Sequence, residues 1–220
     1  MVLAATIGTA SAQVEIGLKV SPGITFLSTD APSSHPVSSA ASRLGFGGGL
    51  VVDYFFGENY AFGTGLQFMS KGGSYSYKYT DGNSLRDAGT TKFSVHYLEV
   101  PLTVKLFTNE IASGTRLYFQ TGFSAAVPIG ARINGEKRYT DPITTQETTA
   151  LKHAFFIDAN FIAGIGAEYQ LATSTKAFAG ISYHRGLVNM DSYFDDERSP
   201  KLADVVFKNN VIALDLGLKF

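Results

Sequence analysis

Hydrophobic and polar residues alternate with a period of two along most of this chain. In the last run, Leu214, Leu216 and Leu218 alternate with Asp215 and Lys219. This is the pattern of a β-strand with one apolar face, because successive side chains point to opposite faces of a sheet. Eight such runs predict strands at residues 14–21, 44–54, 60–69, 98–106, 116–127, 157–169, 177–184 and 212–220.

The segments between the predicted strands alternate in length. Long polar segments lie at 27–42, 78–91, 132–150 and 187–208, and short ones at 56–59, 108–114 and 170–175. Short turns at one end and long loops at the other are typical of outer-membrane β-barrels. The pattern therefore places both chain ends on the short-turn, periplasmic side.

Aromatic residues gather next to the short segments, and a ring of aromatics at one depth forms a girdle at a lipid–water interface. The residues assigned to this girdle are Tyr54, Phe55, Phe56, Tyr60, Phe62, Phe107, Tyr118, Phe119, Tyr169, Phe178 and Phe220.

The volume inside the barrel decides which face points outward. Eight strands enclose room for little more than their own side chains. Bulky rows such as Leu214, Leu216 and Leu218 from every strand would overfill that space, whereas the small and glycine-bearing rows fit. We therefore predict an all-β fold: an eight-stranded antiparallel up-and-down transmembrane β-barrel, apolar outside and polar or glycine-rich inside. A soluble ligand-binding barrel of the lipocalin type would carry charges on the outward rows, and mid-strand charges are nearly absent there.

Composition narrows the chemistry further. The 220 residues include no Cys, which excludes disulfides, a thiol nucleophile and Cys-ligated zinc. Charged residues make up 17% of the chain, against roughly 25% in an average soluble domain. The net charge of -1 gives no electrostatic reason to expect nucleic acid as a partner.

The amino-terminal segment has features of a signal peptide. Ala10-Ser11-Ala12 before Gln13 is a small-x-small cleavage pattern, and the preceding residues are apolar and small. We expect residues 1–12 to be the remainder of a signal peptide and residues 13–220 to form the outer-membrane β-barrel domain.

One run of residues resembles a known family. The stretch from His96 to Lys105, HYLEVPLTVK, resembles the Y-L-E-[IV]-P-L-x-x-K signature of PorT-like outer-membrane barrels of the Bacteroidota. Lys71-Gly72-Gly73 and the opening and closing strands also look similar. The resemblance covers essentially the whole mature chain and implies an eight-stranded barrel in a Gram-negative outer membrane, with a link to secretion. The terminal Phe220 resembles the aromatic signal that the barrel-assembly machinery reads.

Charged residues on the inward rows are the candidate site. We predict a polar network in the lumen, because buried charges must be paired and hydrogen-bonded. Its expected members are Glu15, Lys19, Glu99, Lys105, Arg116, Asp158 and Asp215. Asp53, Glu168, Lys71 and Lys219 lie on the same inward rows. The predicted role is a salt-bridged plug, and a proton path or narrow channel is the alternative.

Catalytic chemistry has weaker support in the sequence. Ser182 and His184 lie two residues apart on an inward row. Small outer-membrane acyl hydrolases instead have the order His-x-Ser, on a lipid-facing surface. A nucleophile also needs a base and an orienting third group, which the sequence does not identify. The acidic residues Asp191, Asp195, Asp196 and Glu197 lack a calcium-loop spacing and are expected in a solvated loop. No catalytic residue, metal or cofactor is therefore predicted.

These observations predict a non-enzymatic outer-membrane barrel that is structural or accessory to secretion or surface interaction. A narrow porin-like channel is the alternative, and a lipid-modifying enzyme is a third. The expected partners are outer-membrane lipid, the barrel-assembly machinery, and a secretion complex or surface partner that contacts the long loops; nucleic acid is not among them.

Overall fold

The computed structural model describes residues 13–30, 37–81, 84–141, 145–192 and 205–220. The expected signal-peptide remnant at 1–12 lies outside the described residues, and so do Asp195, Asp196 and Glu197 of the acidic segment. The described part contains no helix that is long and apolar enough to cross a membrane.

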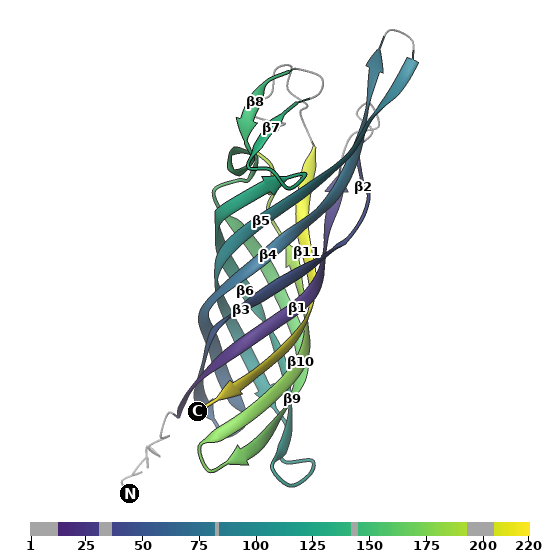
Figure 1. Ribbon diagram of the computed structural model, residues 1–220. Helices are drawn as coiled ribbons and strands as arrows, with labels where there is room; N and C mark the ends of the chain where they lie inside the picture. The colour runs from purple at the N-terminus through teal and green to yellow at the C-terminus, as the bar shows by residue number, and fades with distance from the viewer. Residues whose placement is uncertain (1–12, 31–36, 82–83, 142–144, 193–204) are drawn as a thin grey trace, which may run out of the picture.

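Eight long strands close into an antiparallel barrel (Figure 1). In order around the barrel they are β1 (Val14–Asp30), β3 (Arg43–Gly57), β4 (Tyr60–Asp81), β5 (Ser84–Phe107), β6 (Thr115–Ile133), β9 (Asp158–Ala172), β10 (Thr175–Gly186) and β11 (Val206–Lys219). Each strand pairs with the next, and β11 pairs with β1 to close the ring. This confirms the predicted fold class, and each predicted run overlaps one barrel strand.

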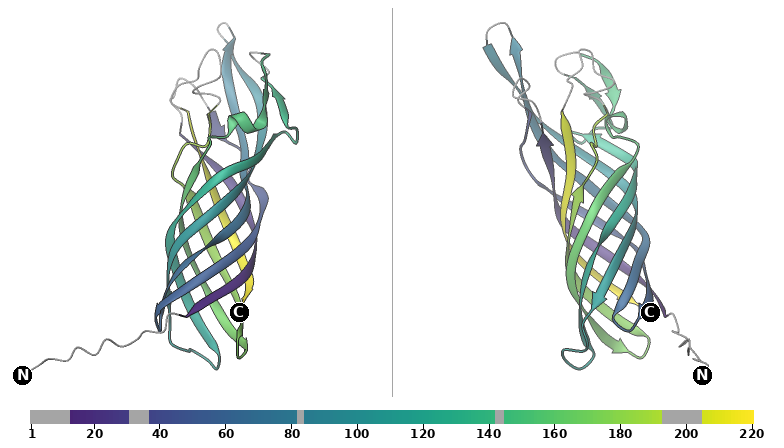
Figure 2. Two further views of the ribbon diagram at one scale, coloured as in Figure 1. Left: turned by 90° about the vertical axis from the view of Figure 1, so that its left-hand side faces the viewer. Right: turned by 180° about the vertical axis from the view of Figure 1, so that it is seen from behind.

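Smaller elements lie at one end of the barrel (Figures 1 and 2). The short strand β2 (Val37–Ser39) pairs with β4, and β7 (Arg138–Thr140) pairs with β8 (Glu147–Thr149). A 3-10 turn, η1 (Ala150–His153), follows β8. We call this the long-connection end. The opposite, short-turn end holds the β3–β4, β5–β6 and β9–β10 turns. Phe220 also lies there, and its backbone N–H and C=O bond with Ile16 at 2.8 and 3.2 Å.

Side chains alternate between the two faces of the barrel wall as the sequence pattern requires. On β11, Leu214 and Leu216 are 45% and 38% exposed, whereas Asp215 between them is 2% exposed. The same alternation recurs on the other barrel strands, so the apolar rows face outward and the charged rows face the interior. An outward band of this kind is what a lipid environment stabilises.

The prediction of a long loop at residues 78–91 is wrong. β4 continues to Asp81 and β5 begins at Ser84, so the two strands form a paired arm that extends beyond the rest of the wall (Figure 1). The tyrosines at 75, 77 and 79 alternate with polar residues, a strand pattern that runs up to the turn signal Asp81-Gly82. High polarity masked this pattern, because most of the residues between and after these tyrosines are polar.

The aromatic girdle is correct for only part of the predicted set. Tyr54, Phe56, Tyr60, Phe62, Phe119, Tyr169 and Phe220 are exposed, but Phe55, Phe107, Tyr118 and Phe178 are buried inside the barrel with Val51 and Ala61. Strand parity explains the error, because these four residues lie on the inward rows.

Inward glycines make room for the buried aromatic rings. A Cβ at Gly166 or Gly180 would lie within 2.5 Å of the Tyr118 side chain, and one at Gly217 within 2.4 Å of the Phe178 ring. Real Cβ atoms do not approach other atoms so closely, so the rings occupy the space that the missing side chains leave. The glycine-rich inward rows are therefore packing surfaces for aromatic residues.

Candidate functional site: the charged interior of the barrel

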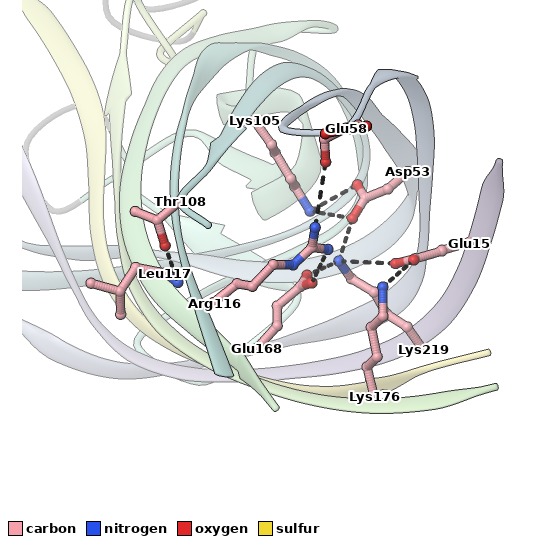
Figure 3. Close-up of polar contacts among 10 residues, drawn as sticks. All are labelled: Glu15, Asp53, Glu58, Lys105, Thr108, Arg116, Leu117, Glu168, Lys176 and Lys219. Carbon is pink, nitrogen blue, oxygen red and sulfur yellow. Dashed lines mark hydrogen bonds and ion pairs between the residues drawn. The ribbon is translucent and has the colours of Figure 1, made fainter. Parts of the chain in front are cut away.

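Seven charged residues fill the interior near the short-turn end (Figure 3). We call them the short-turn cluster: Glu15, Asp53, Lys105, Arg116, Glu168, Lys176 and Lys219. Lys219 is at its centre, because its Nζ lies 2.5 Å from Asp53, 3.9 Å from Glu15 and in direct contact with Glu168. Its side chain is 1% exposed.

The other cations complete the cluster from different strands. Lys105 on β5 lies 2.8 Å from Asp53 on β3, and Lys176 on β10 contacts Glu15 on β1. Arg116 on β6 lies 3.7 Å from Glu168 and donates to the backbone oxygen of Glu58 at 3.4 Å. Three carboxylates thus face four cations. The surplus cation is partly compensated by aromatic faces, since the Arg116 guanidinium lies 4.9 Å from the Phe107 ring.

A second group, the mid-barrel cluster, lies deeper in the barrel. Lys71 on β4 is fully buried and lies 2.9 Å from Glu99 on β5 and 3.3 Å from Asp158 on β9. Gln67 donates to Glu99 at 3.1 Å, and Asn209 donates to Asp158 at 3.5 Å and to the Tyr97 hydroxyl at 3.2 Å. Each carboxylate therefore has a cation and an amide donor, as a buried charge requires.

Lys19 and Asp215 form a separate pair. Lys19 on β1 lies 3.3 Å from Asp215 on β11, and the Ser21 hydroxyl donates to the same carboxylate at 2.5 Å. All seven predicted network residues therefore lie inside the barrel, but they form three separate groups. Glu15, Lys105 and Arg116 belong to the short-turn cluster, Glu99 and Asp158 to the mid-barrel cluster, and Lys19 with Asp215 to this pair.

Two members were missed by reasoning from the sequence. Lys176 lies beside a turn, yet it shares the inward parity of Phe178, Ser182 and His184, which would have found it. His184 was assigned no partner, but its Nδ1 lies 3.5 Å from Glu99 Oε1. No sequence spacing could have linked them, because they come from β10 and β5.

This contact gives Ser182 and His184 the third group that the sequence did not identify. The Ser182 hydroxyl lies 3.2 Å from His184 Nε2, so Ser182, His184 and Glu99 are arranged in the order nucleophile, base and acid. All three residues are at most 1% exposed. The cavity beside His184 is about 30 Å³, which holds a water molecule or two and no acyl chain. The geometry therefore orients His184 in the plug without admitting a substrate.

Open space in the barrel lies at the short-turn mouth. A pocket of about 600 Å³ there is lined by Phe55, Glu58, Arg116, Glu168 and Lys176 among others. Farther in, the 30 Å³ cavity is bounded by Lys105, Tyr118 and Phe178 on one side and by Gln67 and His184 on the other. Side chains of the two clusters thus fill the passage between them.

Apolar side chains close the long-connection end. Tyr75, Phe93, Tyr97, Met190 and Phe207 belong to one buried cluster with Ala150 of η1. His153 of η1 packs edge-on against Tyr139, with ring centroids 5.3 Å apart, and its Nε2 lies 2.6 Å from the Thr148 hydroxyl. Burial lowers the pKa of His153 to about 4, so its ring is neutral at pH 7. The β7–β8 segment and η1 thus form an apolar cap over the interior.

Comparison with known proteins identifies the class of barrel. The family model described as "Outer membrane protein beta-barrel domain" matches residues 9–192. No curated protein matches the chain in sequence.

Solved structures of outer-membrane barrels cover nearly the whole chain at low identity. The N-terminal β-barrel domain of OprF from Pseudomonas aeruginosa is 12% identical, covers 95% of this chain and 99% of its own, and has a TM-score of 0.41. Neisserial surface protein A is 13% identical, with coverage of 95% and 99% and a TM-score of 0.45. The outer membrane protease OmpT from Escherichia coli is 10% identical, with coverage of 96% and 97% and a TM-score of 0.41. Similarity at this level carries no functional information.

Proposed function

Because the chain belongs to the outer membrane protein beta-barrel domain family, and therefore lies in the outer membrane, we propose that it is a plugged, non-enzymatic barrel that supports secretion or interactions at the cell surface. The observation that carries this proposal is the filled interior. Twelve charged side chains, drawn from all eight barrel strands, form ion pairs with one another across the lumen and are not spread along a water path.

Paired charges in a narrow barrel favour structure over transport. A channel needs open volume along its axis, and the space between the two clusters is about 30 Å³. A lipid-modifying enzyme needs a nucleophile that reaches an acyl chain, and Ser182 is 1% exposed on the interior face. The interior therefore supports a plug that stiffens the wall.

The orientation is part of the proposal. Both termini are placed in the periplasm and the long-connection end outside, because short periplasmic turns and longer external segments are the rule for such barrels. The exposed terminal Phe220 serves as the aromatic signal for the barrel-assembly machinery, which pairs with the last strand by β-augmentation. Residues 1–12, with the cleavage pattern Ala10-Ser11-Ala12, are the proposed export signal.

The finer assignment follows the motif. Tyr97, Leu98, Glu99, Pro101 and Leu102 support a place among PorT-like barrels of the Bacteroidota, and hence a connection to secretion. In the structure, two of these motif residues belong to the mid-barrel cluster: Glu99 pairs with Lys71, and the Tyr97 hydroxyl accepts from Asn209. The motif thus preserves the plug, while the β4–β5 arm and the cap present the surface that a secretion or surface partner contacts.

Two measurements test the proposal. Membrane fractionation with gels of boiled and unboiled samples is expected to show the protein in the outer membrane with heat-dependent mobility. The purified barrel in planar bilayers is expected to show no single-channel current. Steady currents would show that the barrel is a channel and would overturn the proposal of a plugged interior. A soluble protein without a mobility shift would overturn the membrane assignment.

A separate comparison tests the absence of catalysis. Cells that overproduce the wild-type protein and cells that overproduce Ser182→Ala are expected to have the same phospholipid and lipid A species by mass spectrometry. A change that occurs with the wild type and disappears in the variant would make the Ser182–His184–Glu99 arrangement an active site.

A further inference from the structure

Three cations line a groove on the outer wall of the barrel at the long-connection end. The groove has a volume of about 430 Å³ and is bordered by Arg43 on β3, Lys92 on β5 and Arg132 on β6, together with Ser74 and Ser94. Its lining includes no carboxylate. In the described part of the chain, none of the three cations forms an ion pair, although the interior cations do so throughout.

Backbone geometry holds these cations close together. Ser94 is the direct cross-strand partner of Arg132, and Lys92 precedes it by two residues on the same outward row of β5. Arg43 reaches over β4 and donates to the Ser94 hydroxyl at 2.6 Å and to the Lys71 carbonyl at 3.1 Å. Because these acceptors are neutral oxygens, they orient the guanidinium without neutralising its charge.

The depth of the groove matches the edge of the apolar band. On β5 the outward residues change from Lys92, Ser94 and His96 to Leu98 and then Val100 toward the barrel centre. On β3 the outward apolar row ends at Leu44, which is 83% exposed, and Arg43 is the first residue of the strand; on β6 the change occurs between Arg132 and Ile129, which is 54% exposed. The strands β3, β5 and β6 therefore each place a cation where the lipid-facing rows end, at the level of lipid headgroups.

We propose that this groove binds the phosphate groups of an outer-leaflet lipid, with Arg43, Lys92 and Arg132 around the headgroup and the apolar residues below in contact with its acyl chains. Guanidinium and ammonium groups are the side chains that bind phosphate. Uncompensated cations beside a low-dielectric membrane are stabilised by anionic headgroups. The assignment to the outer leaflet rests on the proposed function, which places this end outside the cell.

The test is lipid binding to the full-length protein in detergent, followed by native mass spectrometry. The probes are bisphosphorylated lipid A, the same glycolipid with its phosphates removed, and inorganic phosphate. The test variant is Lys92→Gln/Arg132→Gln. The matched control is Lys137→Gln/Lys152→Gln, which removes two exposed charges from the same end outside the groove.

The wild type is expected to bind one bisphosphorylated lipid A. The test variant is expected to bind it about 30-fold more weakly, from about a factor of five for each lost cation at a membrane surface, and the control variant as tightly as the wild type. Equal binding by the test variant, an equal loss in the control, or equal binding of the dephosphorylated glycolipid would each overturn the inference. Inorganic phosphate that displaces the lipid at the same concentration would make free phosphate the ligand and overturn the lipid assignment.

The proposed function and this inference fail in different ways. A protein that fractionates with the outer membrane but binds lipid A equally in all variants overturns the lipid site alone. A protein absent from the outer membrane overturns the proposed function, whatever the binding in detergent shows.

Discussion

Removal of the Lys71 charge is expected to destabilise the barrel strongly. Lys71→Met keeps the length and apolar stem of the side chain but leaves Glu99 and Asp158 buried without their shared cation. At an effective dielectric constant of about 20, the contacts at 2.9 and 3.3 Å are each worth about 5–6 kcal/mol of attraction. Desolvation of the ions offsets several kcal/mol, so the net loss is about 3–5 kcal/mol, as for other buried pairs that lose one partner.

The assay is equilibrium unfolding in lipid vesicles with guanidinium chloride. Because the chain has no Trp and 11 Tyr, tyrosine fluorescence and the heat-dependent gel mobility report folding. Lys152→Met is the control, since Lys152 is exposed on η1 and its loss is expected to change stability little.

A double variant separates charge from packing. Lys71→Met/Glu99→Gln removes one uncompensated carboxylate, so it is expected to recover part of the stability that the single variant loses. The reasoning would be refuted if Lys71→Met lowered the free energy of unfolding no more than Lys152→Met does. It would also be refuted if Glu99→Gln lowered the free energy of unfolding as much in the Lys71→Met background as it does alone.

Three further predictions concern the wall, the cap and assembly. Leu216→Arg puts a charge on the lipid-facing row and is expected to cost about 2–4 kcal/mol in vesicles; if Leu216→Arg were silent and Asp215→Leu harmful instead, the inside and outside faces would be reversed. The pKa of His153 is about 4 in the folded state and 6.5 in a free histidine, so the neutral ring stabilises the fold fully above pH 6.5. This contribution, at most about 3 kcal/mol, is lost as pH falls from 6.5 toward 4. The unfolding midpoint of the wild type is therefore expected to fall over this pH range, and that of His153→Gln is expected to lack this part of the pH dependence. Phe220→Ser is expected to lower the amount of heat-modifiable protein in the outer membrane without changing the unfolding free energy of the folded fraction, and equal yields in pulse-labelled cells would contradict the assembly role.

Strand parity predicted which residues face the interior, but not which of them meet. Parity placed Lys71 and Glu99 on inward rows, yet the cross-strand partner of Lys71 is Val95 and that of Glu99 is Gln67. The two charges meet because strands tilt in a barrel and long side chains reach along the axis, a geometry that depends on the shear of the closed sheet. The sequence pattern does not contain this shear.

The aromatic residues near the turns show a different limit. Grouping them by their position in the chain put Phe178 in the girdle, although its even number on β10 placed it beside Ser182 and His184 inside. Position along a strand sets the depth of a side chain, and parity sets its face, so both are needed. The apolar cap could not be predicted at all, because it joins Phe93, Met190 and Ala150 from distant parts of the chain.

The paired β4–β5 arm sets how far from the bilayer another molecule can contact the protein. Beyond Phe68, the last exposed aromatic among the described side chains of β4, residues 69–81 continue as strand for about 40 Å of chain. A ladder of backbone hydrogen bonds makes these paired strands stiffer than a loop of the same length, so their ends at Asp81 and Ser84 stand at a set height beyond the wall. With the proposed orientation, in which the long-connection end lies outside the cell, that height sets the distance from the membrane at which a surface partner first contacts the barrel.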